Sequence, residues 1–409
     1  MGLTRLSLAT AGARPEYARF PEGGRAANVR ALYVHVPFCT TKCHYCDFYS
    51  LAGHLGEADN YLAALEREIA LQTALVGRCV PETVFIGGGT PTLLDAGRLE
   101  RLLGIIQAAA DLGGVREFTI EANPNTFSPD RAAVLARLGV NRISFGAQSF
   151  VQSELETLQR DHDPENVPLA VAMARAAGIE NINIDLIFGT PGQTLASWEY
   201  SLGRALALEP QHLSAYSLIY EPNTAMTARM KRGEFALLDE ELELAMFNRV
   251  YEMLRAAGLE RYEVSNHARP GLECRHNLHY WMGSEYLAWG PAAAAYVGGY
   301  RWKNVQSLAH YLEALLGPAP VLPLTQMERL DPIRHAGELA MLQLRLVAGI
   351  EFAAFEARTG VDPRPRLAQV LAKYEGLGLL AVSATRLALT DKAVPVSDAI
   401  VADVLEAFS

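Results

Sequence analysis

The chain has 409 residues, of which half are hydrophobic and a fifth are charged, as in ordinary globular proteins. Its formal net charge of −10 argues against a general electrostatic interaction with nucleic acid or an anionic membrane. No apolar run approaches the roughly 20 residues needed to span a bilayer. We therefore expect no nucleic-acid partner and no transmembrane segment, while peripheral membrane contact through a local patch stays open.

The N-terminal residues 1–28 contain one short apolar piece, "LSLATAGA", followed closely by Arg14, Glu16 and Arg19. This pattern lacks the hydrophobic core of a secretion signal, and the acidic residues argue against an organelle transit peptide. The five cysteines are odd in number and clustered, unlike a secreted disulfide framework. We expect a flexible extension over residues 1–28 of a cytoplasmic protein.

Short apolar runs alternate with segments of helical periodicity, of which "YLAALEREIALQTAL" (61–75) is the clearest. Ser128-Pro129 and Asp163-Pro164 place a capping residue before a proline, which predicts two helix starts. The apolar runs predict six strands: "ALYVHV" (31–36), "TVFIGG" (83–88), "EFTIEA" (117–122), "RISFGA" (142–147), "NINIDLIF" (181–188) and "HLSAYSLI" (212–219).

The alternation of strands and helices predicts an α/β protein with a parallel sheet and right-handed crossovers. An open six-stranded partial barrel and a doubly wound sheet both fit this count, and both place the site beyond the carboxyl ends of the strands. Polar residues and glycines collect at those ends: the cysteine cluster, "GGGTPT" (87–92), Glu121, Gln148 and Asp185. We therefore expect one functional site at this rim.

Toward the C-terminus the alternation of strands and helices gives way to mainly helical patterns. "AGELAMLQLRLVAGI" (336–350) and "RPRLAQVLAKYEGLGLL" (364–380) have helical patterns, and "LAVSATRLALT" (380–390) predicts a short β pair. We expect a barrel domain over residues 29–300 and a small, mainly helical, winged-helix-like domain over 301–409. The alternative is a lid or packing module without a nucleic-acid role, which the acidic net charge favours.

Three of the five cysteines, Cys39, Cys43 and Cys46, lie within "HVPFCTTKCHYCDF" (35–48). Three thiolates on one loop can bind three irons of a 4Fe–4S cube and leave the fourth iron open. A zinc site completed by His44 or His35 is the alternative, and a disulfide is disfavoured because one thiol would remain unpaired. Apolar and aromatic neighbours favour the iron–sulfur cluster. The Cys-x3-Cys-x2-Cys spacing resembles that of the radical S-adenosylmethionine (SAM) enzymes, which implies that SAM binds the open iron.

Further motifs follow in an order that resembles one radical SAM subfamily: "YVHVPFCTTKCHYCDF", "FIGGGTPTLL", "EANP", "RISFGAQSF", "LQRDHD" and "NIDLIFGTPGQT". The subfamily includes oxygen-independent coproporphyrinogen III oxidase and the related haem chaperones. The resemblance covers roughly residues 30 to 390 by motif order. It implies a partial (β/α)6 barrel, which periodicity alone does not establish.

The resemblance also implies a set of SAM contacts. Glycines allow close approach of the backbone to the ligand, carboxylates suit its hydroxyls or ammonium, and arginine suits its carboxylate. The alternative for each polar residue is an ordinary surface ion pair. The implied contacts are Tyr33, Tyr45, Gly88, Gly89, Thr90, Glu121, Gln148, Arg160 and Asp185.

Two features distinguish oxidase from chaperone within the resemblance. The oxidases typically carry a further cysteine two positions after the third, where this chain has Phe48. Downstream, "ECRHNLHYW" (273–281) contains the haem-binding motif of the chaperones, formed by His276, Asn277, Tyr280 and Trp281. Histidine is the commonest axial ligand of haem, and aromatic side chains offer flat surfaces to the macrocycle. The axial ligand stays open among His276, His279 and Cys274.

One segment departs from the family pattern. Where the family has a "GPGAHS"-like segment, this chain has "WGPAAAAYVGG" (289–299), so Ala294 or Ala295 replaces the family's histidine. The favoured hypothesis is a haem chaperone that binds a 4Fe–4S cluster, SAM and haem and lacks coproporphyrinogen oxidase activity. Its partners would be haem-accepting proteins, with respiratory haem proteins among the candidates, and an electron donor if SAM is cleaved. The alternatives are the oxidase itself and a radical SAM enzyme acting on another substrate.

Overall fold

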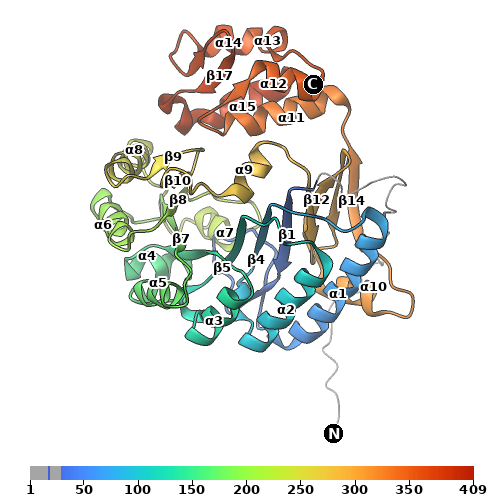
Figure 1. Ribbon diagram of the computed structural model, residues 1–409. Helices are drawn as coiled ribbons and strands as arrows, with labels where there is room; N and C mark the ends of the chain where they lie inside the picture. The colour runs from blue at the N-terminus through green and yellow to red at the C-terminus, as the bar shows by residue number, and fades with distance from the viewer. Residues whose placement is uncertain (1–16, 19–28) are drawn as a thin grey trace.

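The computed structural model describes residues 17–18 and 29–409 (Figure 1). The extension expected over residues 1–28 therefore lies outside the described residues, apart from Tyr17 and Ala18. Six parallel strands form the centre of a twelve-stranded sheet, in which they lie in chain order. They are β1 (Ala31–Val36), β4 (Thr83–Gly88), β5 (Glu117–Ala122), β6 (Arg142–Gln148), β7 (Asn181–Phe188) and β8 (His212–Ser217). The six predicted strands and the partial barrel are confirmed.

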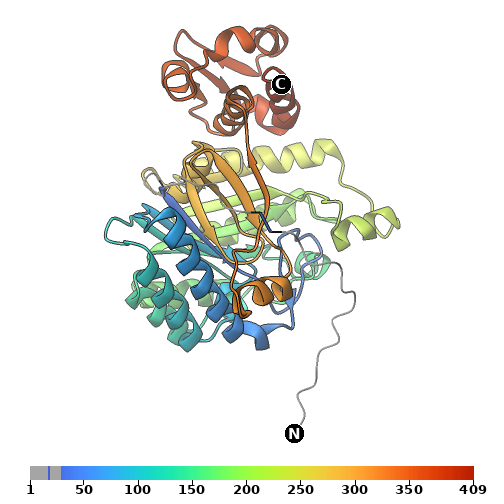
Figure 2. The same ribbon diagram turned by 90° about the vertical axis from the view of Figure 1, so that its right-hand side faces the viewer.

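Helices connect these strands and cover the outer face of the sheet (Figures 1 and 2). The periodic segment 61–75 belongs to α1, whose buried residues Leu62, Leu65 and Ile69 recur at helical spacing. Burial of such a stripe against the sheet is what holds each crossover in place. The crossover helices are α1 (Ala58–Val76), α2 (Ala96–Ala109), α3 (Pro129–Arg137), α4 (Gln152–Leu158), α5 (Asn166–Ala176) and α6 (Leu195–Leu206).

The two predicted helix starts have different outcomes. Helix α3 begins at Pro129, directly after Ser128, as predicted. Helix α5 begins at Asn166, two residues after Pro164. The carboxylate of Asp163 accepts a hydrogen bond from the Glu165 backbone N–H at 2.8 Å, so these residues form a turn that precedes the helix.

The sheet continues on both sides of the parallel core through strands that the sequence did not predict. On the side of β1 lie β11 (Tyr286–Trp289), β12 (Ala294–Val297), β13 (Tyr300–Asn304) and β14 (Leu324–Arg329). On the side of β8 lie β10 (Asn266–Ala268) and the two-residue strand β9 (Glu260–Arg261). The Ala18 backbone N–H donates to the carbonyl oxygen of Leu324 at 2.8 Å, so the described N-terminal residues lie along β14. The remaining helices of this part are α7 (Ala225–Lys231), α8 (Glu240–Ala256), α9 (Arg275–Trp281) and α10 (Leu308–Leu316).

A second hydrophobic core begins after the large sheet, and we call this part, residues 332–409, the C-terminal unit. Its helices are α11 (Pro332–Leu344), α12 (Phe352–Thr359), α13 (Pro363–Arg366), α14 (Ala368–Tyr374) and α15 (Ser397–Glu406). Its small sheet contains β15 (Ile350–Glu351), β16 (Leu380–Val382) and β17 (Arg386–Leu389), so the predicted helices and β pair are confirmed. Because β13 and β14 lie in the large sheet, we propose a domain boundary near residue 330 in place of 301.

The C-terminal unit lies over one end of the barrel, next to α9 (Figures 1 and 2). Arg358 donates hydrogen bonds to the backbone carbonyl oxygens of Met282 and Gly283, just after α9. The guanidinium of Arg345 lies over the ring of Trp281, 4.5 Å from its centroid. Within the described ranges, no helix is both long and apolar enough to cross a membrane.

Candidate functional site

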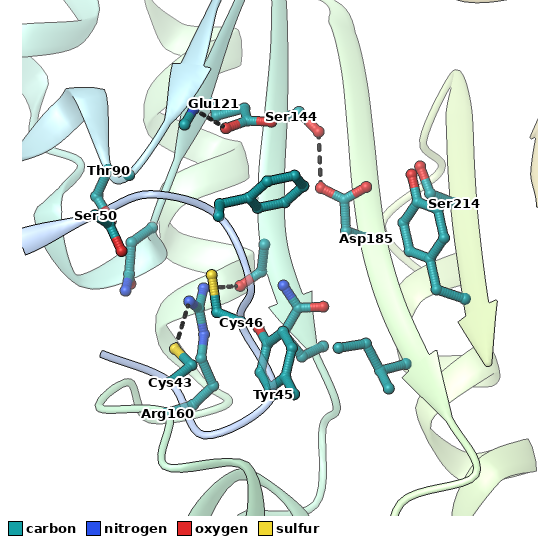
Figure 3. Close-up of a pocket in the computed structure, with 18 of the residues that line it drawn as sticks. Cys43, Tyr45, Cys46, Ser50, Thr90, Glu121, Ser144, Arg160, Asp185 and Ser214 are labelled. Carbon is teal, nitrogen blue, oxygen red and sulfur yellow. Dashed lines mark hydrogen bonds between the residues drawn. The ribbon is translucent and has the colours of Figure 1, made fainter. Parts of the chain in front are cut away.

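A cavity of about 570 Å³, the first cavity, opens at the carboxyl ends of the parallel strands (Figure 3). Alternate residues of a strand face the same side of the sheet, and those of β6, β7 and β8 form one wall. The cysteine loop forms the opposite rim. The strand residues are Ser144, Gly146 and Gln148; Asn183, Asp185 and Ile187; and His212, Ser214 and Tyr216.

Cys39, Cys43 and Cys46 all line this cavity: Cys39 ends β2 (Phe38–Cys39), and the other two lie on the loop that leads to β3 (Leu51–Ala52). All three are free thiols of intermediate exposure. Burial raises the pKa of the Cys39 and Cys46 thiols, and Lys42 partly offsets this. Arg160 Nη1 lies 3.5 Å from the Sγ of Cys43, where it can stabilise a thiolate (Figure 3). The loop therefore presents three ligands to the cavity.

The surroundings of this loop favour a cluster over zinc. The ring of His35 is bonded to Tyr33 at 3.0 Å and to the carbonyl oxygen of Tyr49 at 2.8 Å, and His44 Nδ1 lies 3.0 Å from Arg229. Both ring nitrogens of His35 are thus engaged, and His44 is engaged at Nδ1. In the described part of the chain, no three His, Cys, Asp or Glu side chains converge on one metal ion. Thiolates that each bind a different iron of a cube need no such convergence.

The glycine motif at the end of β4 forms a close-fitting wall of the first cavity. Gly88 has φ 107°, and a Cβ there would lie 2.4 Å from the His35 ring. A Cβ on Gly89 would lie 2.6 Å from the carbonyl oxygen of Phe38, beside the first cysteine. Only glycine fits either position. The motif thus brings bare backbone to the cavity, as the fit of a ligand beside the cluster requires.

Two carboxylates, Glu121 and Asp185, face the same cavity (Figure 3). Glu121 accepts one hydrogen bond, from the Gly88 backbone N–H at 3.0 Å. Burial, reinforced by the charge of Asp185, raises the pKa of Glu121 to about 7. Asp185 accepts from Ser144 at 2.8 Å and from Asn183 at 2.9 Å. Neither carboxylate forms an ion pair with a described residue, so the pair suits the hydroxyls or ammonium of a ligand.

The charge at the cysteine end of the cavity has the opposite sign. Arg160 is half-buried there and donates to the carbonyl oxygen of Gly146 at 2.6 Å, while its buried Nε has no partner among the described residues. Gln148 follows at a sheet irregularity with φ 65°, which turns its side chain into the cavity. Tyr45 also lines the cavity and packs against a small apolar group formed by Leu158, Ile187, Leu218 and Met226. A ligand with an ammonium and a carboxylate would match this polarity.

Most of the expected SAM residues therefore converge, and one does not. Tyr45, Gly88, Gly89, Thr90, Glu121, Gln148, Arg160 and Asp185 all line the first cavity. Tyr33 lines a neighbouring cavity instead, with its hydroxyl bonded to His35.

This second cavity, of about 860 Å³, adjoins the first. Phe48, Phe85, Gly88, Glu121 and Asn277 line both cavities. Aromatic rings dominate the barrel side, and α11 with Arg358 supplies the side formed by the C-terminal unit. The aromatic side chains on the barrel side are Tyr33, Phe48, Phe85, Tyr280, Trp281, Tyr286 and Tyr296.

The motif histidine is bonded at both ring nitrogens. In His276, Nδ1 lies 2.9 Å from the Thr83 hydroxyl and Nε2 lies 3.0 Å from the Tyr280 hydroxyl. Burial lowers the pKa of His276 to about 3, so its ring is neutral. In this arrangement His276 forms part of the cavity wall, while Asn277, Tyr280 and Trp281 also line the cavity.

The other two expected axial ligands lie elsewhere. The Cys274 thiol is buried and lies 3.3 Å from the carboxylate of Glu117, which also accepts the Arg275 backbone N–H at 2.8 Å. His279 Nε2 lies 3.7 Å from Glu82, and neither cavity includes His279. None of the three expected ligands thus presents an unbonded donor atom to the second cavity.

Comparisons with known proteins assign the family. Residues 33–204 match the radical SAM superfamily, and residues 330–396 match the HemN C-terminal domain. A Bacillus subtilis protein named Heme chaperone HemW is 37% identical over 366 residues, which cover 88% of this chain and 95% of the relative. The chain belongs to the HemW family of radical SAM proteins. A Mycobacterium tuberculosis HemW is 38% identical over 377 residues, which cover 91% of this chain and 94% of that one.

Membership of the HemW family agrees with the fold. Coproporphyrinogen III oxidase from Escherichia coli, a radical SAM enzyme, superposes with a TM-score of 0.81 over 94% of this chain and 91% of the enzyme. At 23% sequence identity, this similarity concerns the fold alone. A radical SAM family implies a 4Fe–4S cluster and SAM, and the three thiols, the glycine wall and the paired carboxylates fit them.

Several residues at the HemW-family site were missed from the sequence. Ser144, Asn183, His212 and Ser214 line the first cavity from within the otherwise largely apolar strands β6, β7 and β8. Their signal was present, because polar residues at alternate positions of an otherwise apolar strand mark one face of the sheet. Four residues of the second cavity carried no comparable signal: Arg301, Arg329, His335 and Arg358.

Proposed function

We propose that this protein is a haem chaperone, which binds a 4Fe–4S cluster, SAM and haem and delivers haem to acceptor proteins. The observation that carries the proposal is an aromatic cavity of about 860 Å³ directly beside the cysteine cavity. Tyr280 and Trp281 of the motif lie in its wall and offer flat surfaces to a macrocycle. Sequence similarity to proteins named heme chaperones supports the same function.

In this proposal each group of the first cavity has a defined role. Cys39, Cys43 and Cys46 hold the cluster, which when bound provides an open iron for SAM and an electron for its reduction. The Gly88–Thr90 backbone approaches the amino group of SAM. Glu121 and Asp185 accept hydrogen bonds from the ligand, and Arg160 faces its carboxylate. Tyr45 places an aromatic ring on the cysteine loop, beside the cluster.

Phe48 supports the chaperone over the oxidase. It occupies the position of the further cysteine that the oxidases typically carry, its side chain is 70% exposed, and it lines both cavities. A thiol at this junction could act on a substrate in either cavity, whereas a phenyl ring offers only apolar contact. Oxidation of coproporphyrinogen is the second candidate function, because the fold is shared with that enzyme.

The partners follow from the proposed delivery. They are haem-accepting proteins, with respiratory haem proteins among the candidates, and an electron donor if SAM is cleaved. We further propose a cytoplasmic location.

One preparation can test the whole proposal. Protein reconstituted anaerobically with iron and sulfide should bind about four irons per chain and give an electron paramagnetic resonance signal that SAM alters. It should bind haem near one equivalent and leave coproporphyrinogen unchanged. Cys43→Ala should abolish the cluster signal, whereas Cys79→Ala, at a buried thiol outside the loop, should retain it. Robust turnover of coproporphyrinogen would refute the chaperone function, and stoichiometric zinc would refute the cluster.

A further inference from the structure

Two histidines line the second cavity, and only one of them has unbonded ring nitrogens. His276 is bonded to Thr83 and Tyr280. His335 lies on α11 in the C-terminal unit, and neither of its ring nitrogens has a hydrogen-bond partner among the described residues. Its ring stacks against Tyr296, with 5.9 Å between centroids and 26° between planes. His335 is therefore oriented by packing while its nitrogens stay available.

The groups that face His335 favour its neutral form. Burial lowers the pKa of His335, and the nearby guanidinium groups of Arg358 and Arg301 lower it further, against the opposing charge of Glu338. An imidazole binds a metal through a nitrogen lone pair, which only the neutral ring has. His335 thus has the protonation state that ligation requires.

Two arginines of the second cavity lack an anionic partner. Arg301 is paired with Glu328 at 2.7 Å and with Glu338 at 3.0 Å. Arg329 lies 5.1 Å from the centroid of the Tyr300 ring, and Arg358 donates only to backbone carbonyl oxygens. Neither Arg329 nor Arg358 forms an ion pair with a carboxylate within the described ranges. The cavity can therefore accept two additional carboxylates.

The remaining wall suits a flat apolar body. Trp281 lines the cavity, and its Nε1 has no acceptor in the described part of the chain. Leu339 and Leu342 of α11 face the aromatic residues of the barrel across the cavity. A flat, amphipathic dicarboxylate that carries a metal at its centre would match the ring surfaces, the two arginines and the histidine together.

We propose that the second cavity binds haem, with His335 as axial ligand and with Arg329 and Arg358 as partners of the two propionates. This inference rests on the proposed haem-chaperone function and gives it a location. The haem then contacts two parts of the chain that have separate hydrophobic cores. Its axial ligand comes from the C-terminal unit, and the aromatic side chains that pack against it come from the barrel. The motif residue His276 is a positioning residue, which holds Tyr280 in the wall.

Haem titration of the full-length reconstituted protein tests the ligand. His335→Ala should shift the Soret band and weaken haem affinity by about tenfold or more, and added imidazole should restore the spectrum. His54→Ala, at an exposed histidine that lines neither cavity, is the matched control and should bind haem like the wild type. Unchanged iron content and thermal unfolding show that the variants are folded.

Iron-free protoporphyrin IX separates the ligand from the propionate contacts. The double variant Arg329→Gln/Arg358→Gln should weaken binding of both haem and iron-free porphyrin, because each loses two charge-assisted hydrogen bonds. His335→Ala should weaken binding of haem alone. Arg364→Gln, at an exposed arginine of the same unit, serves as the control.

The outcomes separate the two proposals. Wild-type protein that binds no haem would refute the chaperone function and this inference with it. Stoichiometric haem binding with an unchanged spectrum in His335→Ala would refute the inference alone. A shifted spectrum in His276→Ala, without one in His335→Ala, would place the ligand in the motif and also refute it.

Discussion

Two glutamates of this protein, the buried Glu68 and the half-buried Glu121, have similarly raised pKa values in very different surroundings. Burial raises the pKa of each to about 7. Glu68 accepts four hydrogen bonds, from Gln72, the Gly290 backbone N–H, Asn304 and Tyr311. Glu121 accepts one, from the Gly88 backbone N–H, and faces a cavity. A shifted pKa alone therefore does not identify a functional site; unused hydrogen-bonding capacity does.

The two regions differ in what the carboxylate connects. Glu68 lies on α1, and its partners belong to the turn after β11, to β13 and to α10. These elements are far apart in the chain, so one side chain joins them. Glu121 instead lies at the end of a strand whose neighbours also end at the cavity. The comparison predicts that Glu68 acts on stability and Glu121 on binding.

The largest effect is expected from Glu68→Ala. The substitution leaves the donors of Gly290, Asn304 and Tyr311 unpaired in the interior, and each such donor costs about 1–3 kcal/mol. We expect the free energy of unfolding, measured with urea, to fall by more than about 3 kcal/mol. Glu66→Ala, at an exposed position of the same helix, is the control. Equal stability of the two variants would contradict the structural role of Glu68.

At Glu121 and Asp185 the expected loss is in affinity. Glu121→Ala and Asp185→Ala should each weaken SAM binding about ten- to a hundredfold, since a hydrogen bond to a charged group contributes about 1.5–3 kcal/mol. Cluster content and unfolding should stay close to wild type. The readout is equilibrium dialysis of SAM against reconstituted protein. Unchanged affinity in both variants would show that these carboxylates do not contact SAM.

A smaller effect follows from the pH dependence of Glu121. A cationic ligand favours the ionised carboxylate, so SAM affinity should rise as pH increases toward 7, by up to about tenfold per unit, and then level off. Stability should change in the opposite sense. Protonated Glu121 makes its full contribution to the free energy of unfolding below about pH 4.3, and this contribution is lost as pH rises through 7. In Glu121→Gln both dependences should be reduced; a wild-type slope in that variant would exclude Glu121 as their source.

The smallest effect concerns the turn that Glu68 holds. Ala292 has φ 64°, a left-handed conformation that disfavours residues with a Cβ, and its backbone N–H donates to the carbonyl oxygen of Val305 at 3.0 Å. Ala292→Gly should stabilise the protein by up to about 1 kcal/mol. Thermal unfolding would measure this gain. A loss of stability would mean that the turn is not strained.

The parallel core of the fold was accessible from the sequence because each strand is a local apolar run. The extra strands were not, since β11 and β12 have only four residues each and β13 and β14 mix apolar with polar and charged residues, and their pairing is set by tertiary contacts. Helix α5 also began later than expected, because the turn at Asp163 competes with the helix for its backbone.

Most residues of the first cavity could likewise be predicted from the sequence, because they follow strands that end together. Only one side of the second cavity could be predicted from the sequence. His276 to Trp281 form one local motif, whereas His335 and Arg358 come from helices with ordinary amphipathic patterns. Nothing local marks them, because they meet the motif only where the C-terminal unit lies against α9. The sequence also suggested His276 as a ligand, since its bonds to Thr83 and Tyr280 depend on folding.

The open sheet also bears on self-association. An unpaired edge strand is a template for a strand from another copy, and proteins discourage this with short edges, charges or covering segments. One edge here is β9, with only two residues. The other is β14, which carries Glu328 and Arg329 and whose Leu324 carbonyl oxygen is already bonded to Ala18. The sheet thus ends on both sides in strands that are poor partners for intermolecular pairing, which protects the protein from edge-to-edge aggregation.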